Sequence, residues 1–223
     1  MRITSFVATF ALIAALVLPA AAADKKPTTL EERVSYGIGL NIGRDFKGKN
    51  FDVKPDLLAQ GIKDVLAGGD VLMSDDEVRQ TIMELQQVLQ QKMSAKNKAE
   101  GDAFLAANAK KDGVKVTESG LQYRVIKEGT GATPKADSTV KVNYRGTLVD
   151  GTEFDSSYKR GQPATFQLNR VIPGWTEGLQ LMKAGGKYEF VLPPALAYGE
   201  QGAGQAIGPN SVLVFEVELL EVQ

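Results

Sequence analysis

Residues 140–157 read VKVNYRGTLVDGTEFDSS. Between Val140 and Tyr144, apolar and polar residues alternate, which is the period of a strand that has one buried face. Asp150 and Gly151 are a strong signal for a tight turn, and the apolar Phe154 follows them. The stretch therefore predicts two antiparallel strands joined by a short turn.

The same period of two continues on both sides of this hairpin, from Val114 to the end of the chain. Further strands are expected at residues 121–125, 165–168, 188–192 and 212–219. The segment 175–182 fits a short helix with its apolar residues on one side. Five or six strands and one helix indicate an α+β domain, in which an antiparallel sheet curls over the helix.

Residues 24–112 have the helical period instead. The first helix begins at a capping box, in which the hydroxyl of Thr29 and the carboxylate of Glu32 satisfy free backbone N–H groups. Its apolar residues recur every four positions and form a stripe on one face: Leu30, Val34, Ile38, Ile42 and Phe46.

Two more helices are expected in this half. The second begins near Pro55, a residue suited to the first helical turn, and ends at Gly68. The third opens with the capping box of Ser74 and Glu77. No proline interrupts it before Gly113, and a helix from Asp75 to Lys111 would be on the order of 55 Å long.

The helical half is too small to bury its own apolar stripes. We therefore expect residues 24–90 to form a homodimer. Residues 91–112 continue the long helix, and the polar stretch 94–102 within it would be a solvated stalk. The alternative is that the helices pack as a bundle on the C-terminal half of the same chain.

Residues 1–23 have the pattern of a secretory signal peptide. Arg2 precedes an apolar run from Phe6 to Leu18, and Pro19 and four alanines follow it, so cleavage is expected before Asp24. An uncleaved membrane anchor is the alternative, but the run is short for a span of roughly 20 residues. The mature chain would have no stable membrane insertion and would reside in a bacterial periplasm, at the outer-membrane surface or outside the cell.

Composition excludes most catalytic chemistries. The 223 residues are 43% hydrophobic and 24% charged, which is a globular composition, and they include neither Cys nor His. Thiolate nucleophiles, imidazole bases, disulfides and zinc sites with nitrogen or sulfur ligands are therefore excluded. The 26 basic residues balance 27 acidic ones, which argues against a nucleic-acid partner. We expect no metal and no cofactor.

Several motifs of the C-terminal half resemble, in order and spacing, those of the FKBP-type peptidyl-prolyl cis-trans isomerases over roughly residues 117–222. They are VNYRG at 142–146, GTEFDSS at 151–157, VIPGW at 171–175, GGK at 185–187, PPALAYG at 193–199 and LVFEVEL at 213–219. The helical half, including SYGIG at 35–39, is similar to the N-terminal dimerisation domain of the periplasmic FkpA and macrophage infectivity potentiator (Mip) branch. The implied domains are a helical dimerisation domain at 24–90, the stalk at 91–112 and an isomerase domain at 113–223.

The resemblance implies a half-wrapped antiparallel sheet around a short helix, with a shallow apolar pocket between them and Trp175 as its floor. It assigns the catalytic roles to Asp155, Tyr198 and Tyr144. It assigns substrate binding to Phe154, Val171, Ile172, Trp175, Ile207, Phe215 and Arg160. Ala164 and Ala203 stand where some members of the family have larger residues.

Rotation about an X-Pro amide needs none of the excluded chemistries. Its barrier of about 18–20 kcal/mol comes from amide resonance, which is lost in the twisted transition state. An apolar pocket favours the twisted, less polar form over the planar form. The implied partners are proline-containing unfolded or nascent polypeptides, with rapamycin or tacrolimus as candidate ligands. A non-enzymatic dimeric holdase is the alternative function, and a hydrolase lacks the paired carboxylates it would need.

Overall fold

The computed structural model describes residues 26–49 and 51–223, and the expected signal peptide lies outside this range. Contacts within the chain divide it into two units between Leu72 and Met73. None of the described helices has a segment both long and apolar enough to cross a membrane.

The first unit contains α1 (Leu30–Gly48) and α2 (Pro55–Ala67). The expected capping box of α1 is confirmed: the Glu32 N–H donates to Thr29 Oγ1 over 3.2 Å, and the Glu32 carboxylate accepts the Thr29 N–H over 3.1 Å. Helix α2 ends at Gly68, whose φ of 63° is the left-handed conformation that glycine adopts without strain. No residue of either helix is buried within the chain.

The second unit contains α3 (Asp75–Asn108) and the sheet. Helix α3 begins at the expected capping box of Ser74 and Glu77 but ends three residues before Lys111. The Asn108 side chain explains this early end, since it is buried and donates to Gln122 Oε1 over 2.9 Å. That bond fixes the helix end beside the sheet, and the chain turns into the first strand.

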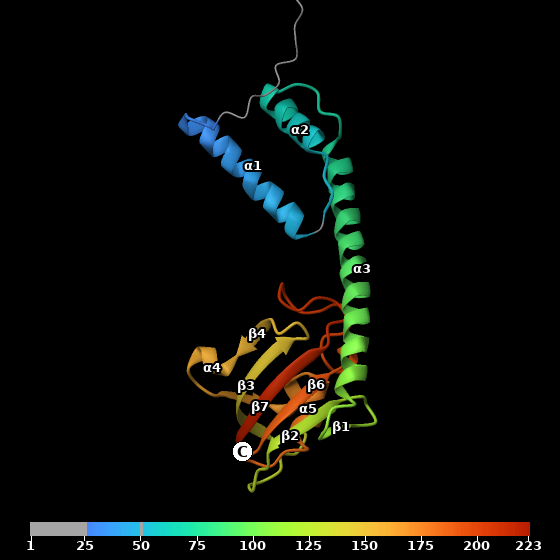
Figure 1. The fold of residues 1–223 in the computed structure, drawn as a ribbon, viewed down its shortest axis with the longest axis vertical. Helices are drawn as coiled ribbons and strands as arrows, with labels where there is room; N and C mark the ends of the chain where they lie inside the picture. Colours follow the sequence, from blue (N-terminus) through green and yellow to red (C-terminus); the bar gives the residue numbers. More distant parts are fainter. Residues whose placement is uncertain (1–25, 50) are drawn as a thin grey trace, which may run out of the picture. The chain divides into compact units, whose positions relative to one another are not determined.

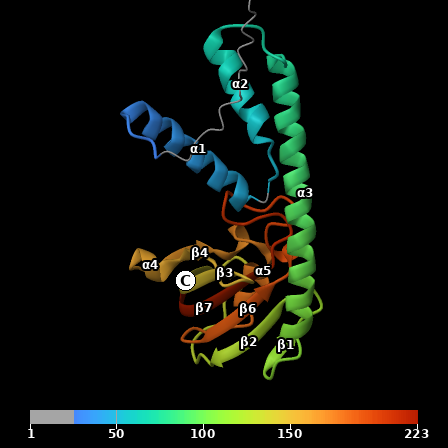
Figure 2. The same cartoon turned by 45° about the horizontal axis from the view of Figure 1, so that its top comes forward.

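Residues 91–112 differ from the expected solvated stalk. Most of their side chains are exposed, but one face of α3 contacts the sheet domain, as Figures 1 and 2 both show. Gly101 is buried on this face, and a Cβ built on it would lie 2.7 Å from Cγ2 of Val212. The sequence concealed this contact because several of its residues on α3, including Ser94, Asn97 and Gly101, are small or polar and do not form an apolar stripe.

The sheet has seven strands, and all their pairings are antiparallel. The order is β1-β2-β6-β7-β3-β4, and β5 also pairs with β3. The expected five or six strands did not include the three-residue β1. The strands are β1 (Val114–Val116), β2 (Gln122–Lys127), β3 (Thr139–Leu148), β4 (Glu153–Ser156), β5 (Ala164–Gln167), β6 (Lys187–Leu192) and β7 (Leu213–Val222).

The main core lies between the sheet and α5 (Pro173–Leu179). Two glycines of α5 allow the close approach: a Cβ on Gly174 would lie 2.5 Å from Leu192, and one on Gly178 would lie 2.8 Å from Phe190. Three short helices complete the domain: α4 (Ser157–Arg160), η1 (Leu168–Arg170) and η2 (Pro194–Leu196). This α+β architecture confirms the expected fold class.

Candidate functional site

A cavity of about 480 Å³ opens between the N-terminal end of α5 and one face of the sheet. Strands β3, β4, β5 and β7 contribute lining residues, and the segments before α5 and after η2 complete it. The lining residues are Tyr144, Phe154, Asp155, Phe166, Arg170, Val171, Ile172, Trp175, Tyr198 and Phe215. The cavity is therefore mainly aromatic and aliphatic, with one carboxylate.

Trp175 is at the centre of the aromatic cluster and is only 4% exposed. Its ring meets those of Tyr144, Phe166 and Phe215 nearly edge to face, with centroids 5.1, 5.4 and 5.3 Å away. Such edge-to-face contacts are favourable because the positive edge of one ring faces the negative face of another. Three neighbours of this kind fix the orientation of the indole.

Local sequence explains why these side chains converge. The alternation along β3 places Val142, Tyr144 and Gly146 on the buried face of the strand. Pro173 at the first turn of α5 disfavours a helical conformation at the preceding residue, and Ile172 is extended, with φ of −60° and ψ of 147°. Val171 and Ile172 therefore line the cavity before the helix begins.

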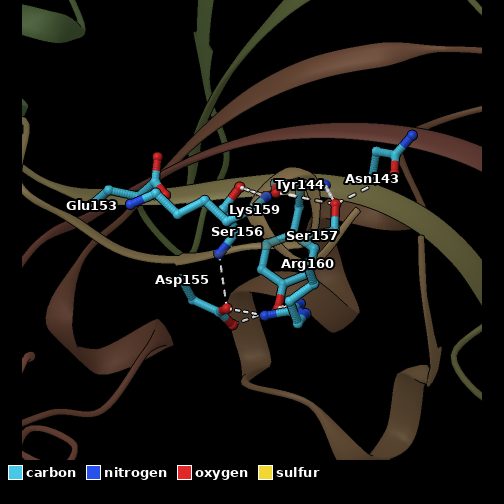
Figure 3. Close-up of polar contacts among 8 residues, drawn as sticks. All are labelled: Asn143, Tyr144, Glu153, Asp155, Ser156, Ser157, Lys159 and Arg160. Carbon is cyan, nitrogen blue, oxygen red and sulfur yellow. Dashed lines mark hydrogen bonds and ion pairs between the residues drawn. The ribbon is translucent and has the colours of Figure 1, made fainter. Parts of the chain in front are cut away.

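The polar part of the site is a cluster of Tyr144, Asp155 and Arg160 (Figure 3). The Tyr144 hydroxyl donates to Asp155 Oδ2, and Arg160 pairs with Asp155 Oδ1. Arg160 Nη2 also donates to the Tyr144 hydroxyl over 2.7 Å, and its guanidinium lies 5.4 Å from the centre of the Tyr144 ring. The Ser156 N–H donates to Asp155 Oδ1 over 2.8 Å. The carboxylate is thus held by three donors.

These contacts determine the charge of Asp155. Partial burial raises its pKa, but the hydrogen bonds from Tyr144 and Arg160 and the positive charge of Arg160 outweigh burial and leave the pKa below its ordinary value. Burial and the bond to Asp155 raise the pKa of Tyr144. At neutral pH the cavity therefore contains a carboxylate anion and a neutral phenol.

Ser157 anchors Tyr144 from behind the cavity, a role that no sequence pattern indicated. The Ser157 side chain is fully buried, and its hydroxyl accepts the Tyr144 N–H over 2.8 Å. The same hydroxyl lies 3.3 Å from both the Tyr144 carbonyl oxygen and Asn143 Oδ1 (Figure 3). Strand β4 ends at Ser156, so this side chain replaces a ladder bond that the strand no longer supplies.

Eight of the ten residues expected at the site line the cavity. Arg160 is not among the lining residues but is bonded to Asp155 and Tyr144. Ile207 does not line the cavity: it is 7% exposed and belongs to the core cluster, where a small bridge pairs it with Ala203. Phe166 and Arg170 also line the cavity, although neither was expected there from the sequence. The alternation of the strand at 165–168 could have indicated Phe166, whereas no local pattern marked Arg170.

The low pKa of Asp155 predicts a flat pH profile. Activity is expected to change little between about pH 8 and 6, and to fall only as the carboxylate is protonated below about pH 4. Because the folded-state pKa is lowered, the stabilisation that this group provides is present above its unfolded pKa and is lost as the pH falls through the folded value.

Arg160→Ala removes one cause of the low pKa of Asp155 and should move the acid limb of the pH profile to higher pH. The isomerase activity that the sequence predicts, measured from pH 3 to 8, would test this, and a steep loss between pH 8 and 6 would contradict it.

Comparison with family models gives two adjoining matches. Residues 131–220 match the model described as FKBP-type peptidyl-prolyl cis-trans isomerase. Residues 31–125 match the model described as the domain amino terminal to FKBP-type peptidyl-prolyl isomerase. Together the two models cover both the sheet domain and the helical half.

Curated relatives match most of the chain. Outer membrane protein MIP of Legionella longbeachae is 46% identical over 88% of this chain and 87% of its own length. FkpA of Aeromonas hydrophila, named an FKBP-type peptidyl-prolyl cis-trans isomerase, is 49% identical over 92% of this chain and 81% of its own length. The crystal structure of FkpA from Escherichia coli superposes with a TM-score of 0.69 at 40% identity, covering 89% of this chain and 99% of that one.

Proposed function

Because the chain belongs to the FKBP-type peptidyl-prolyl cis-trans isomerases and has their activity, we propose that the aromatic cavity around Trp175 is where it isomerises X-Pro bonds. The observation that supports this most directly is the composition of the cavity, an apolar aromatic floor with a single carboxylate held by a phenol and a guanidinium. Such a surface is suited to a proline ring, and its carboxylate is already engaged by three donors.

The proposed mechanism is non-covalent. The planar X-Pro amide is polar and well hydrated, whereas the twisted amide has lost its resonance and is less polar. Walls formed by Phe154, Trp175 and Phe215 therefore bind the twisted form better, which is the differential binding that catalysis requires. Lowering the barrier by about 7–8 kcal/mol would accelerate rotation roughly 10⁵- to 10⁶-fold.

We assign two polar roles within this cavity. Tyr198 is 41% exposed and lines the cavity, where its hydroxyl is available to orient the backbone of a substrate. Asp155 presents its negative charge toward the reacting carbonyl, while Tyr144 and Arg160 hold it in place. Proline-containing unfolded or nascent chains are the proposed substrates.

An exchange assay separates this function from the alternative holdase. The full-length protein should accelerate cis/trans exchange of a short X-Pro peptide, and Tyr198→Phe should slow that exchange by roughly tenfold with folding unchanged. A holdase would suppress aggregation of an unfolded client without accelerating cis/trans exchange of the peptide. Trp175 is the single tryptophan of the chain, so its fluorescence would report rapamycin or tacrolimus binding in the same cavity.

We also propose that the protein is a homodimer through residues 24–90 and acts as a folding chaperone for exported proteins. Apolar side chains along α1 and α2 are exposed in the single chain, among them Leu30 at 69%, Ile38 at 55% and Val65 at 70%. Exposed apolar side chains in this number are typical of an interface. Two catalytic domains joined in this way would bind one client with avidity.

The proposed interface gives a direct prediction. Ile38→Asp should make the protein a monomer, because the substitution places a charge in the apolar contact between the two subunits. Sedimentation velocity would measure the change, and Lys110→Asp, at an exposed position outside residues 24–90, is the matched control. A monomeric wild type, or a dimeric Ile38→Asp variant, would contradict the proposed interface.

The remaining proposals concern location and domain limits. The signal-like residues 1–23 and the envelope name of the Legionella relative support a periplasmic or envelope-associated location. The proposed domains are helical residues 24–90, the connecting residues 91–112 and the isomerase domain 113–223. Contacts within the chain divide it between Leu72 and Met73 and so group all of α3 with the sheet.

A further inference from the structure

The loop between η2 and β7 is held from outside the catalytic cavity. It carries Tyr198 at its start and returns along α3 before β7 begins at Leu213. Within the described residues, Asn210 in this loop is the one non-glycine residue with a positive φ, 55°. Left-handed backbone of this kind persists where the surrounding contacts impose it.

Side chains on both elements supply those contacts. Asn97 of α3 donates from Nδ2 to the Pro209 carbonyl oxygen over 2.8 Å, with Ser211 Oγ 3.3 Å away. One turn earlier on the helix, Ser94 Oγ accepts a hydrogen bond from Asn210 Nδ2 over 2.7 Å. The loop is therefore attached to α3 at consecutive residues.

Close packing accompanies these bonds. A Cβ on Gly208 would lie 2.8 Å from Met93 Sδ and 2.9 Å from Asn97 Nδ2. The loop backbone at Gly208 thus packs directly against the side chains of Met93 and Asn97. Neither Met93 nor Asn97 is among the residues that line the catalytic cavity.

The attached part of the loop is bonded in turn to the part that carries Tyr198. The Asn210 N–H donates to the Gly199 carbonyl oxygen over 2.8 Å, and the Gly202 N–H donates to the Tyr198 carbonyl oxygen over 3.2 Å. A continuous path of hydrogen bonds and one peptide link therefore joins Ser94 to the backbone beside Tyr198.

We propose that Asn97 and Ser94 are positioning residues for the isomerase reaction, because they hold the loop 199–211 and through it fix Tyr198 at the rim of the cavity. The proposal rests on the role assigned to Tyr198 above. The connecting helix is thereby part of the catalytic apparatus, although it touches no substrate.

Two variants of the full-length protein test this. Asn97→Asp replaces the donor with an acceptor that faces the Pro209 carbonyl, and kcat/KM for a short X-Pro peptide should fall about fivefold. Gln91→Glu makes the same amide-to-acid change at an exposed position of α3 and should leave kcat/KM unchanged. Asn210→Gly removes the hydrogen bond from Asn210 to Ser94, but glycine adopts the positive φ without strain. This variant should therefore lower kcat/KM as Asn97→Asp does, without lowering the melting temperature.

A double-mutant cycle distinguishes positioning from general stability. If Asn97 acts through Tyr198, Asn97→Asp should have almost no further effect in a Tyr198→Phe background. The proposal is overturned if Asn97→Asp and Asn210→Gly keep wild-type kcat/KM. It is also overturned if Tyr198→Phe has no effect, or if the fivefold loss persists in the Tyr198→Phe background. Failure of the proposed function would give a different result, since the wild-type protein itself would then not accelerate cis/trans exchange of the peptide.

Discussion

Asp155→Ala is expected to lower kcat/KM for a short X-Pro peptide by about 10- to 100-fold while the protein remains folded. Among the described residues that line the cavity, this carboxylate is the only acidic group, and Tyr144 and Arg160 hold it in one orientation. Its removal leaves the Arg160 cation without its counter-charge, which reverses the local electrostatic field. A peptide exchange assay at pH 7 would measure the loss.

The stability cost should be small by comparison. The Asp155 side chain is 41% exposed, and ion pairs at that exposure contribute about 0–1 kcal/mol. Glu189→Ala is the matched control, since it breaks the Glu189–Arg124 ion pair, 3.2 Å long, on β2 and β6 outside the cavity. Both variants should melt near the wild type, and only Asp155→Ala should lose activity. Equal activity in the two variants would remove Asp155 from the mechanism.

Features that depend on a few neighbouring residues could be predicted from the sequence. The capping boxes at Thr29 and Ser74 need only a hydroxyl and a carboxylate three residues apart, and both occur where expected. The turn at Asp150 and Gly151 likewise depends on two adjacent residues. Gly151 has a φ of 86°, a conformation that glycine adopts without strain. The strands that carry Tyr144 and Phe215 followed from their period of two.

Features that depend on distant segments could not be predicted in this way. Ile207 was assigned to the cavity by motif, but the loop folds back through the Ala203–Ile207 bridge and buries it in the core. Arg170 reaches the cavity because η1 turns the chain just before α5. The contact of α3 was hidden because it relies on Asn97 and Gly101, which read as a polar stretch and not as a packing face.

Gly146 shows how such a long-range constraint can have a larger effect than a catalytic side chain. A Cβ at this position would lie 2.6 Å from Cζ of Phe154 and 2.8 Å from Cε1 of Phe215. Both rings line the cavity and meet each other edge to face with centroids 5.5 Å apart. Phe215 also packs against Trp175, so these rings cannot move away from an added methyl group without changing the shape of the cavity.

Gly146→Ala is therefore expected to reduce kcat/KM by at least about 100-fold, since displacement by about 1 Å near a reaction centre can have that effect. It should also destabilise the fold by about 1–3 kcal/mol through overpacking. Gly69→Ala, where a Cβ meets nothing within 4 Å, is the matched control and should keep full activity. The emission of Trp175, 5.3 Å from Phe215, should change in Gly146→Ala alone. Wild-type activity with unchanged emission would mean that the two rings do not need their present positions, and the proposed preference of a preformed cavity for the twisted amide would then fail.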